Sequence, residues 1–217
     1  MNSGSCLDLK EIFLLYRCKL STNEVYDKAI ENEKVLTPFM HEVASDVGGK
    51  LIGLENRIKS ASSVIKKIRK KADFGINEDE AINSMGDLVR YTLQVEHDLI
   101  AYTAIMVMDK FARNGYNIKE VDNKYAPGSD DTYKAVHINI ESPMGQIFEL
   151  QIHSSKSLEV KKLTHRYYEE SRDPSTSTER RIELKEIMKS ITQKLRMPKY
   201  ILGIISIKIS STYKIKI

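Results

Sequence analysis

Apolar positions repeat along the chain with two periods, and each period predicts its own kind of element. Spacings of three and four residues predict helices over 7–33, 39–47, about 60–71, 97–114, 158–170 and 179–195. Alternation and runs of β-branched or aromatic residues predict strands over 51–58, 87–95, 116–121, 133–140 and 146–153. Helices before, among and after about five strands indicate an α/β fold, in which helices flank a mixed sheet.

The last two predicted strands form a hairpin around the turn Pro143-Met144-Gly145. Side chains alternate across a strand, so the second strand presents three polar residues on one face: Glu149, Gln151 and His153. Its other face is apolar. The hairpin makes the sheet at least partly antiparallel.

Other segments give weaker signals. Pro38 predicts a break between the first two helices, and the helix over 97–114 is expected to point Leu99, Tyr102, Ile105, Met106 and Met108 inward. Residues 122–131 read as a loop and 172–178 as a polar linker. The Ile-rich stretch 201–217 predicts one or two edge strands or a tail that binds a partner.

Length and composition place the chain among ordinary globular proteins. Its 217 residues carry 34 basic and 30 acidic side chains, and the length favours one domain, with or without a small appendage. We divide it into a helical segment over 1–35, a main domain over 36–171, and a C-terminal helix with a basic tail over 172–217. The two cysteines do not form a disulfide framework. No stretch reaches 18 apolar residues, so we expect no membrane span and a cytoplasmic protein.

Positive charge is concentrated at 57–71, where seven cations occur without an acid. Arg57 and Lys59 stand two apart on a predicted strand, and Ser63 and Lys67 stand four apart on the helix that follows. The start of that helix offers free N–H groups and a positive dipole end. Together these groups fit a polyphosphate. The alternative is a basic helix that only faces solvent.

Polar residues on the later strands suit the chemistry of phosphate transfer. Asp87, at a strand end near Arg90, could hold Mg²⁺ beside a triphosphate, or simply face water. Glu149 could serve as a general base or second metal ligand if its face lines a cleft. Tyr133 could stack on a nucleobase, with His137 four residues later on the same face, unless both are ordinary sheet residues. His165, on the following helix, is more often structural than catalytic.

Several motifs follow one another along the chain: RxKxxxSxxxK, Asp and Arg on a strand, YxxxH, ExQ and a later histidine. In this order they resemble the synthetase domain of RelA/SpoT-like alarmone synthetases over roughly 36–170. LVRYTL and THRYYEESRD are similar to a divergent branch found in toxin- and phage-associated proteins and small alarmone synthetases. The resemblance implies a nucleotidyltransferase-like sheet. Arg57, Lys59, Ser63 and Lys67 match the ATP-binding residues of the family, Tyr133 the tyrosine that stacks on the acceptor base, and His137 the histidine four residues later. Glu149 matches the catalytic glutamate, Gln151 its partner, and His165 a histidine on the following helix. We expect Glu149, Asp87 and Arg57 to be catalytic, and Arg90, His137, Gln151 and His165 to take part in nucleotide binding. Thr132 and His153 depart from the long enzymes, which have glycine and arginine there.

The expected activity is therefore transfer of the β,γ-pyrophosphate of ATP to a ribose hydroxyl of a purine nucleotide, giving (p)ppGpp- or (p)ppApp-type alarmones. ATP is the donor, and Asp87 and Glu149 hold Mg²⁺. Two alternatives stay open: modification of tRNA 3′ ends, and a degenerate module that binds nucleotides or protein. The resemblance also allows for a toxin delivered into the cytosol of a target cell, with an antitoxin or host protein as partner.

Overall fold

The computed structural model describes residues 9–77, 80–81, 85–129 and 131–208. Helices alternate with strands along the chain, as the periodicity predicts. In chain order the elements are α1 (Leu9–Asp46), β1 (Lys50–Ile52), η1 (Leu54–Asn56), α2 (Ala61–Ala72), β2 (Val89–Val95), η2 (His97–Leu99), α4 (Ile100–Arg113), β3 (Asn117–Asn123), β4 (Val136–Glu141), β5 (Ile147–Ser154), α5 (Ser155–Arg172), α6 (Thr178–Thr192), η3 (Ile201–Gly203) and β6 (Ile207–Lys208).

The strands form one mixed sheet in the order β1-β2-β5-β4-β3-β6. Strands β2 and β5 are parallel, and every other neighbouring pair is antiparallel. This confirms the α/β class and the hairpin, although the sheet has six strands and we expected about five. The extra strand is β6, which pairs with β3 at the edge and confirms an edge strand in the Ile-rich stretch. Residues 209–217 of that stretch lie outside the described residues.

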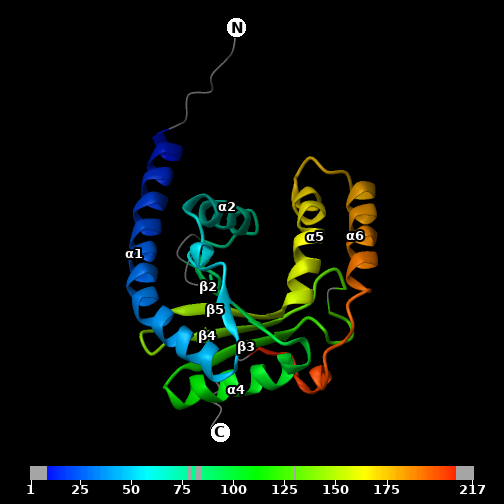
Figure 1. The fold of residues 1–217 in the computed structure, drawn as a ribbon. Coiled ribbons are helices and arrows are strands. Elements are labelled where there is room, and N and C mark those ends of the chain that lie inside the picture. Colours follow the sequence, from blue (N-terminus) through cyan, green and yellow to red (C-terminus); the bar gives the residue numbers. More distant parts are fainter. Residues whose placement is uncertain (1–8, 78–79, 82–84, 130, 209–217) are drawn as a thin grey trace.

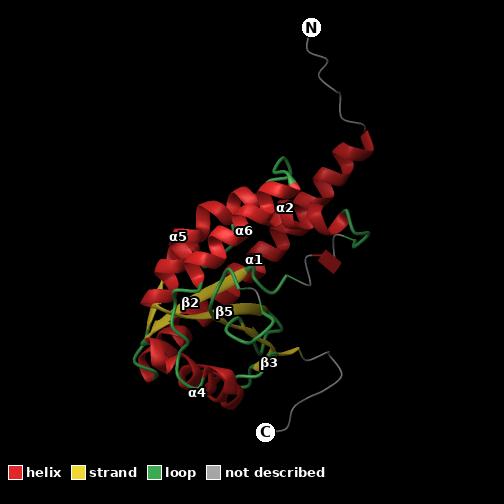
Figure 2. Cartoon of the chain, turned by 90° about the vertical axis from the view of Figure 1, so that its right-hand side faces the viewer, coloured by secondary structure: helices red, strands yellow, loops and turns green. Residues whose placement is uncertain are grey.

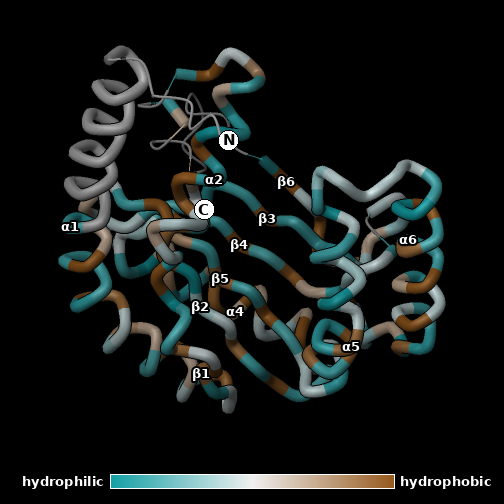
Figure 3. Tube along the Cα trace, turned by 90° about the horizontal axis from the view of Figure 1, so that it is seen from above, coloured by the Kyte–Doolittle hydropathy of each residue, from teal (hydrophilic) through white to brown (hydrophobic). Residues whose placement is uncertain are grey.

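The sheet separates two layers of helices (Figures 1 and 2). Helix α4 covers one face, while α2 and the α5–α6 pair stand on the opposite face and α1 runs along the side of β1 and β2. The strands alternate between hydrophilic and hydrophobic residues, which is visible as teal and brown segments in Figure 3. The apolar face packs on α4: Phe148 is fully buried and its ring lies 5.7 Å from that of Phe111. The polar face is therefore turned toward α2 and α5.

The predicted break at Pro38 is wrong, because α1 continues through it. Leu36, Met40 and Val43 are almost fully buried and follow one helical stripe across the proline. A proline inside a helix costs about 3 kcal/mol, and burial of three large apolar side chains offsets that cost.

The predicted strand over 51–58 is also wrong in most of its length. Gly53 has a φ of 64°, a left-handed conformation that suits glycine and starts η1, so β1 ends at Ile52. Pairing resumes only as an isolated bridge between Ile58 and Val89.

The predicted inward face of the fourth helix is wrong as well. Leu99, Tyr102, Ile105 and Met106 are exposed, and only Met108 of the predicted set packs against the core. The buried stripe is instead Ile100, Ala101, Ala104, Val107 and Phe111. This helix is apolar over much of its circumference, so periodicity alone could not decide which side faces the sheet. None of the described helices has the length and apolar character needed to cross a membrane.

Candidate active site

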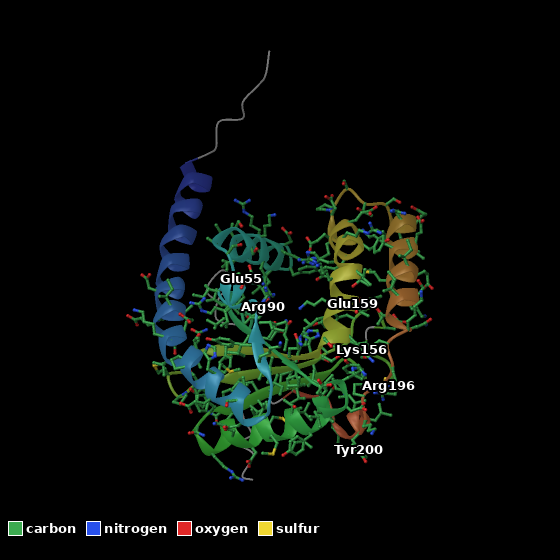
Figure 4. The ribbon with its side chains drawn as sticks, viewed as in Figure 1. Glu55, Arg90, Lys156, Glu159, Arg196 and Tyr200 are labelled. Carbon is green, nitrogen blue, oxygen red and sulfur yellow. The ribbon has the colours of Figure 1, made fainter. Side chains whose placement is uncertain are left out.

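A row of polar side chains crosses the sheet on the face away from α4. Arg90 of β2 stands opposite Glu149 of β5, and Glu149 stands opposite Asn139 of β4. On the other side of Arg90, its backbone N–H donates to the carbonyl of Arg57 at 2.7 Å. Paired residues on neighbouring strands point to the same side, so residues from distant segments of the sequence become neighbours here. Figure 4 labels Arg90 on this face, with α2 above it and α5 across from it.

Asp87 joins two of the predicted phosphate ligands. It precedes β2, and its carboxylate accepts hydrogen bonds from Lys59 at 2.5 Å and from Lys67 of α2 at 2.7 Å. Burial alone would raise the pKa of Asp87, but the two ammonium groups outweigh it and lower this pKa to about 2. Asp87 is therefore ionised at neutral pH and holds two cations next to each other.

Ser63 lies at the start of α2, as predicted. The side chain of Ser60 caps the helix by accepting from the backbone N–H of Ser63, and the two hydroxyls lie 2.9 Å apart. The helix start and Lys67 thus approach the polar face from the same side.

Arg57 is held from α1. Its Nε donates to Glu33 at 2.6 Å and its Nη1 donates to the carbonyl of Leu54 at 2.7 Å. The hydrogen bond from Arg57 lowers the pKa of Glu33. Sequence reasoning missed Glu33, because nothing in its local pattern indicates that the first helix reaches the basic segment.

Glu149 is anchored through both carboxylate oxygens. Oε1 lies 2.9 Å from Nδ1 of His137, and Oε2 accepts from Nε2 of Gln151 at 2.6 Å. Burial would raise the pKa of Glu149, but the hydrogen bonds from His137 and Gln151 bring it below its usual value. The charge of Asp87 acts in the opposite direction on the same pKa, which shows that the two carboxylates sense each other. Glu149 is therefore ionised at neutral pH, and its two oxygens are held in one orientation.

A chain of hydrogen bonds continues from Glu149 into the protein. Nε2 of His137 lies 3.0 Å from the hydroxyl of Tyr133, which lies 2.8 Å from Nε2 of His153. Nδ1 of His153 lies 2.9 Å from Oγ of Ser157 in the first turn of α5. His153 is fully buried, and burial lowers its pKa well below the ordinary histidine value. The imidazole is therefore neutral and has one donor and one acceptor nitrogen.

Lys161 of α5 also reaches this cluster. Its Nζ donates to Oε1 of Gln151 at 2.9 Å and lies 5.7 Å from the centre of the Tyr133 ring. Sequence reasoning missed Lys161. Its spacing places it on the same face of α5 as Ser157 and Thr164, but only the structure shows that these two residues are buried and that this face meets the sheet.

Ten of the eleven predicted site residues gather on or beside this face of the sheet. His165 does not: it is exposed on α5, and no hydrogen bond or ion pair links it to another described residue. It follows Lys161 by four positions, but the helix turns its side chain to solvent.

The two carboxylates fit a magnesium ion in their chemistry. Mg²⁺ prefers hard oxygen ligands and is usually bound by one or two carboxylates together with substrate phosphates. Asp87 and Glu149 supply such oxygens on one face. Among the described residues, no three His, Cys, Asp or Glu side chains gather in a way that could hold a metal ion.

Comparisons with known proteins agree with this architecture. A family model described as "Region found in RelA / SpoT proteins" matches residues 56–173. The crystal structure of the Type VI effector Tas1 with its immunity protein is 20% identical, with a TM-score of 0.55, over 79% of this chain and 94% of that one. The small alarmone synthetases 2 and 1 from Bacillus subtilis are 17% and 19% identical, with TM-scores of 0.54 and 0.51. They cover 79% and 78% of this chain, and 89% and 87% of their own. A search of curated proteins finds no match.

Proposed function

Because the chain belongs to the family of RelA/SpoT proteins, we propose that it is an ATP-dependent pyrophosphokinase. It transfers the β,γ-pyrophosphate of ATP to a ribose hydroxyl of a purine nucleotide and so makes a (p)ppGpp- or (p)ppApp-type alarmone. The observation that carries the proposal is the position of Glu149, a half-buried and ionised carboxylate opposite Arg90, on the face that Lys59 and Lys67 also reach.

The cations on the β2 side bind the donor. Lys59 and Lys67 leave Asp87 for the phosphates of ATP, and Arg57 and Arg90 form the neighbouring positive edge. The hydroxyl of Ser63 and the free N–H groups at the start of α2 add neutral donors. Phosphoryl transfer requires mainly positioning and neutralisation of charge, which is what such a set supplies.

Glu149 takes the proton from the acceptor. The ribose oxygen attacks the β-phosphorus and forms the new O–P bond, while the bond between the α,β-bridging oxygen and the β-phosphorus breaks and AMP leaves. The hydroxyl proton passes to Glu149, whose two oxygens are oriented by His137 and Gln151. Tyr133 stacks on the acceptor base.

Asp87 and Glu149 would hold Mg²⁺. The ion, when bound, neutralises phosphate charge during transfer. In this role Asp87 would exchange its two lysines for the metal.

We also propose a setting for this activity. The similarity of the fold to Tas1, which was solved with its immunity protein, favours a toxin that acts in the cytosol of a target cell and is neutralised by a partner protein. A second acceptor, the 3′ end of tRNA, is favoured by the exposed cations Lys66, Arg69 and Lys70 on α2, which are next to the donor site.

One assay tests the reaction and its acceptor together. Purified protein, Mg²⁺ and [γ-³²P]ATP are incubated with GTP, GDP, ADP, AMP or tRNA, beside the variant Glu149→Ala. Label is expected on one nucleotide acceptor, with at least about 10²-fold less in the variant, the usual contribution of a general base. Label on tRNA alone would select the second acceptor. Undiminished transfer by Glu149→Ala would refute the role of Glu149.

A further inference from the structure

Lys161 is a cation that the donor site does not use. It comes from α5, on the opposite side of Glu149 from Lys59, Lys67 and Arg57. Its side chain is half-buried, and its hydrogen bond goes to the neutral amide of Gln151. It forms no ion pair with any residue that the structure describes. Its ammonium group is therefore held inside the site without a carboxylate partner.

The charges around the site are unevenly compensated. Glu33 pairs with Arg57, and Asp87 pairs with Lys59 and Lys67. Arg90 and Lys161 have no such partner among the described residues, and Glu149 already accepts hydrogen bonds from His137 and Gln151. Burial and the positive charge of Arg90 lower the pKa of Lys161, and the charge of Glu149 offsets these effects only in part. An anion bound beside Lys161 would compensate its charge more fully.

Two contacts place Lys161 relative to the acceptor. Its Nζ lies over the ring of Tyr133, the proposed platform for the acceptor base. Through Gln151 it is one hydrogen bond removed from Glu149, the proposed acceptor of the ribose proton. In a nucleotide, the ribose carries both the base and the 5′-phosphate, so a phosphate has to lie near the other two groups. Lys161 is the cation on this side of Glu149 that contacts both Tyr133 and Gln151.

We infer that Lys161 is a specificity-determining residue that binds the 5′-phosphate of the acceptor nucleotide. Its ammonium group then no longer covers the ring of Tyr133, and the base stacks there. The inference rests on the proposed function, because it takes Tyr133 and Glu149 as the sites for base and ribose. It adds a residue that no other step in the proposed reaction uses.

The variant Lys161→Met tests this, because methionine keeps most of the aliphatic stem and removes the charge. Lys162→Met is the matched control: Lys162 is the next residue of α5, is exposed, and contacts none of the site residues among those described. Binding of GDP, ADP, guanosine and adenosine is measured by calorimetry, and the KM for acceptor and for ATP is measured in the transfer assay. Thermal melting verifies that each variant is folded, and Lys161→Gln replaces any variant that is not.

Lys161→Met should weaken binding of the 5′-phosphorylated nucleotides about 10- to 100-fold, the range expected for one charge-assisted hydrogen bond. Binding of the nucleosides, and the KM for ATP, should change less than about twofold. Lys161→Arg should recover part of the loss, and Lys162→Met should behave as wild type. Equal weakening of nucleosides and nucleotides would overturn the inference. Tighter nucleotide binding by Lys161→Met would also overturn it, since Lys161 would then only cover the ring.

Failure of the reaction and failure of the inference are distinguishable. If wild-type protein transfers label to no acceptor but binds GDP or ADP in a manner that depends on Lys161, the proposed reaction fails and the inference stands. If it binds neither nucleotide, both fail.

Discussion

Removal of the Asp87 charge should destabilise the protein in a way that depends on pH. Asp87 accepts hydrogen bonds from Lys59 and Lys67, and its side chain is only 24% exposed. The variant Asp87→Asn keeps the size of the side chain and one acceptor oxygen but loses the charge. Both lysines then remain on the polar face without their carboxylate partner.

The size of the effect follows from the pKa of Asp87. It falls from 3.8 to about 2 on folding, because the attraction of the two ammonium groups exceeds the cost of burial. At about 1.4 kcal/mol per pKa unit, the folded state gains about 2 kcal/mol from the ionised group. A depressed folded-state pKa means that this stability is fully present above pH 4 or so and is lost as the pH falls toward 2. For a chain of this length, the loss lowers the Tm by about 4–8 °C at pH 7.

Urea denaturation at pH 7, 5, 4 and 3 measures the difference between wild type and Asp87→Asn. The difference should be about 2 kcal/mol at pH 7 and should shrink below pH 4. Asp73→Asn is the control, because Asp73 is exposed at the end of α2 and forms no ion pair among the described residues. A difference below about 0.5 kcal/mol at pH 7 would refute the reasoning. So would a difference equally large at pH 3 and pH 7, because it would not depend on the carboxylate charge.

Two further variants test the hydrogen-bond chain. Glu149→Gln should lower transfer of label from [γ-³²P]ATP at least about 10²-fold. It should shift the Tm by less than about 3 °C, because the new amide can donate to His137 and still accept from Gln151. Transfer above a tenth of the wild-type rate would contradict the role of Glu149 as a general base. Tyr133→Phe removes the hydroxyl between His137 and His153 and should cost about 1–3 kcal/mol in urea denaturation, whereas an unchanged midpoint shows that the hydroxyl holds neither ring.

The parts of the site predicted from sequence are those fixed by local geometry. Alternation in the hairpin placed Glu149, Gln151 and His153 on one face, because the period of a strand leaves no other choice. The start of α2 was likewise predicted near residue 60, because either Ser60 or Ser62 can cap a helix, and the structure has Ser60 as the cap. In each case a few neighbouring residues determine the outcome.

The parts that were missed depend on how helices dock. Glu33 and Lys161 enter the site from α1 and α5, and neither position differs locally from an ordinary exposed helical residue. The prediction of the inward face of α4 was wrong for the same reason: the exposed Ile105 is as apolar as the buried Val107 and Phe111. The side of α4 that faces the sheet is determined by how it packs against Phe148 and its neighbours. These residues belong to another part of the sequence, so the local pattern of α4 does not reveal the packing.

The two sides of Glu149 are held by different interactions, and this has a consequence for binding. On the donor side Lys59 and Lys67 are attached to Asp87 by charge, so in the proposed reaction ATP must take the lysines from Asp87. A carboxylate left without cations is a better ligand for Mg²⁺, and lysines released from it are better ligands for phosphate. Each ligand therefore prepares the site for the other, and by linkage Mg²⁺ and ATP must strengthen each other's binding equally. On the acceptor side, hydrogen bonds among His137, Tyr133 and the neutral His153 keep the base platform in place without such an exchange. In the proposed reaction the donor side is thus rearranged by its ligands, while the acceptor side is largely preformed.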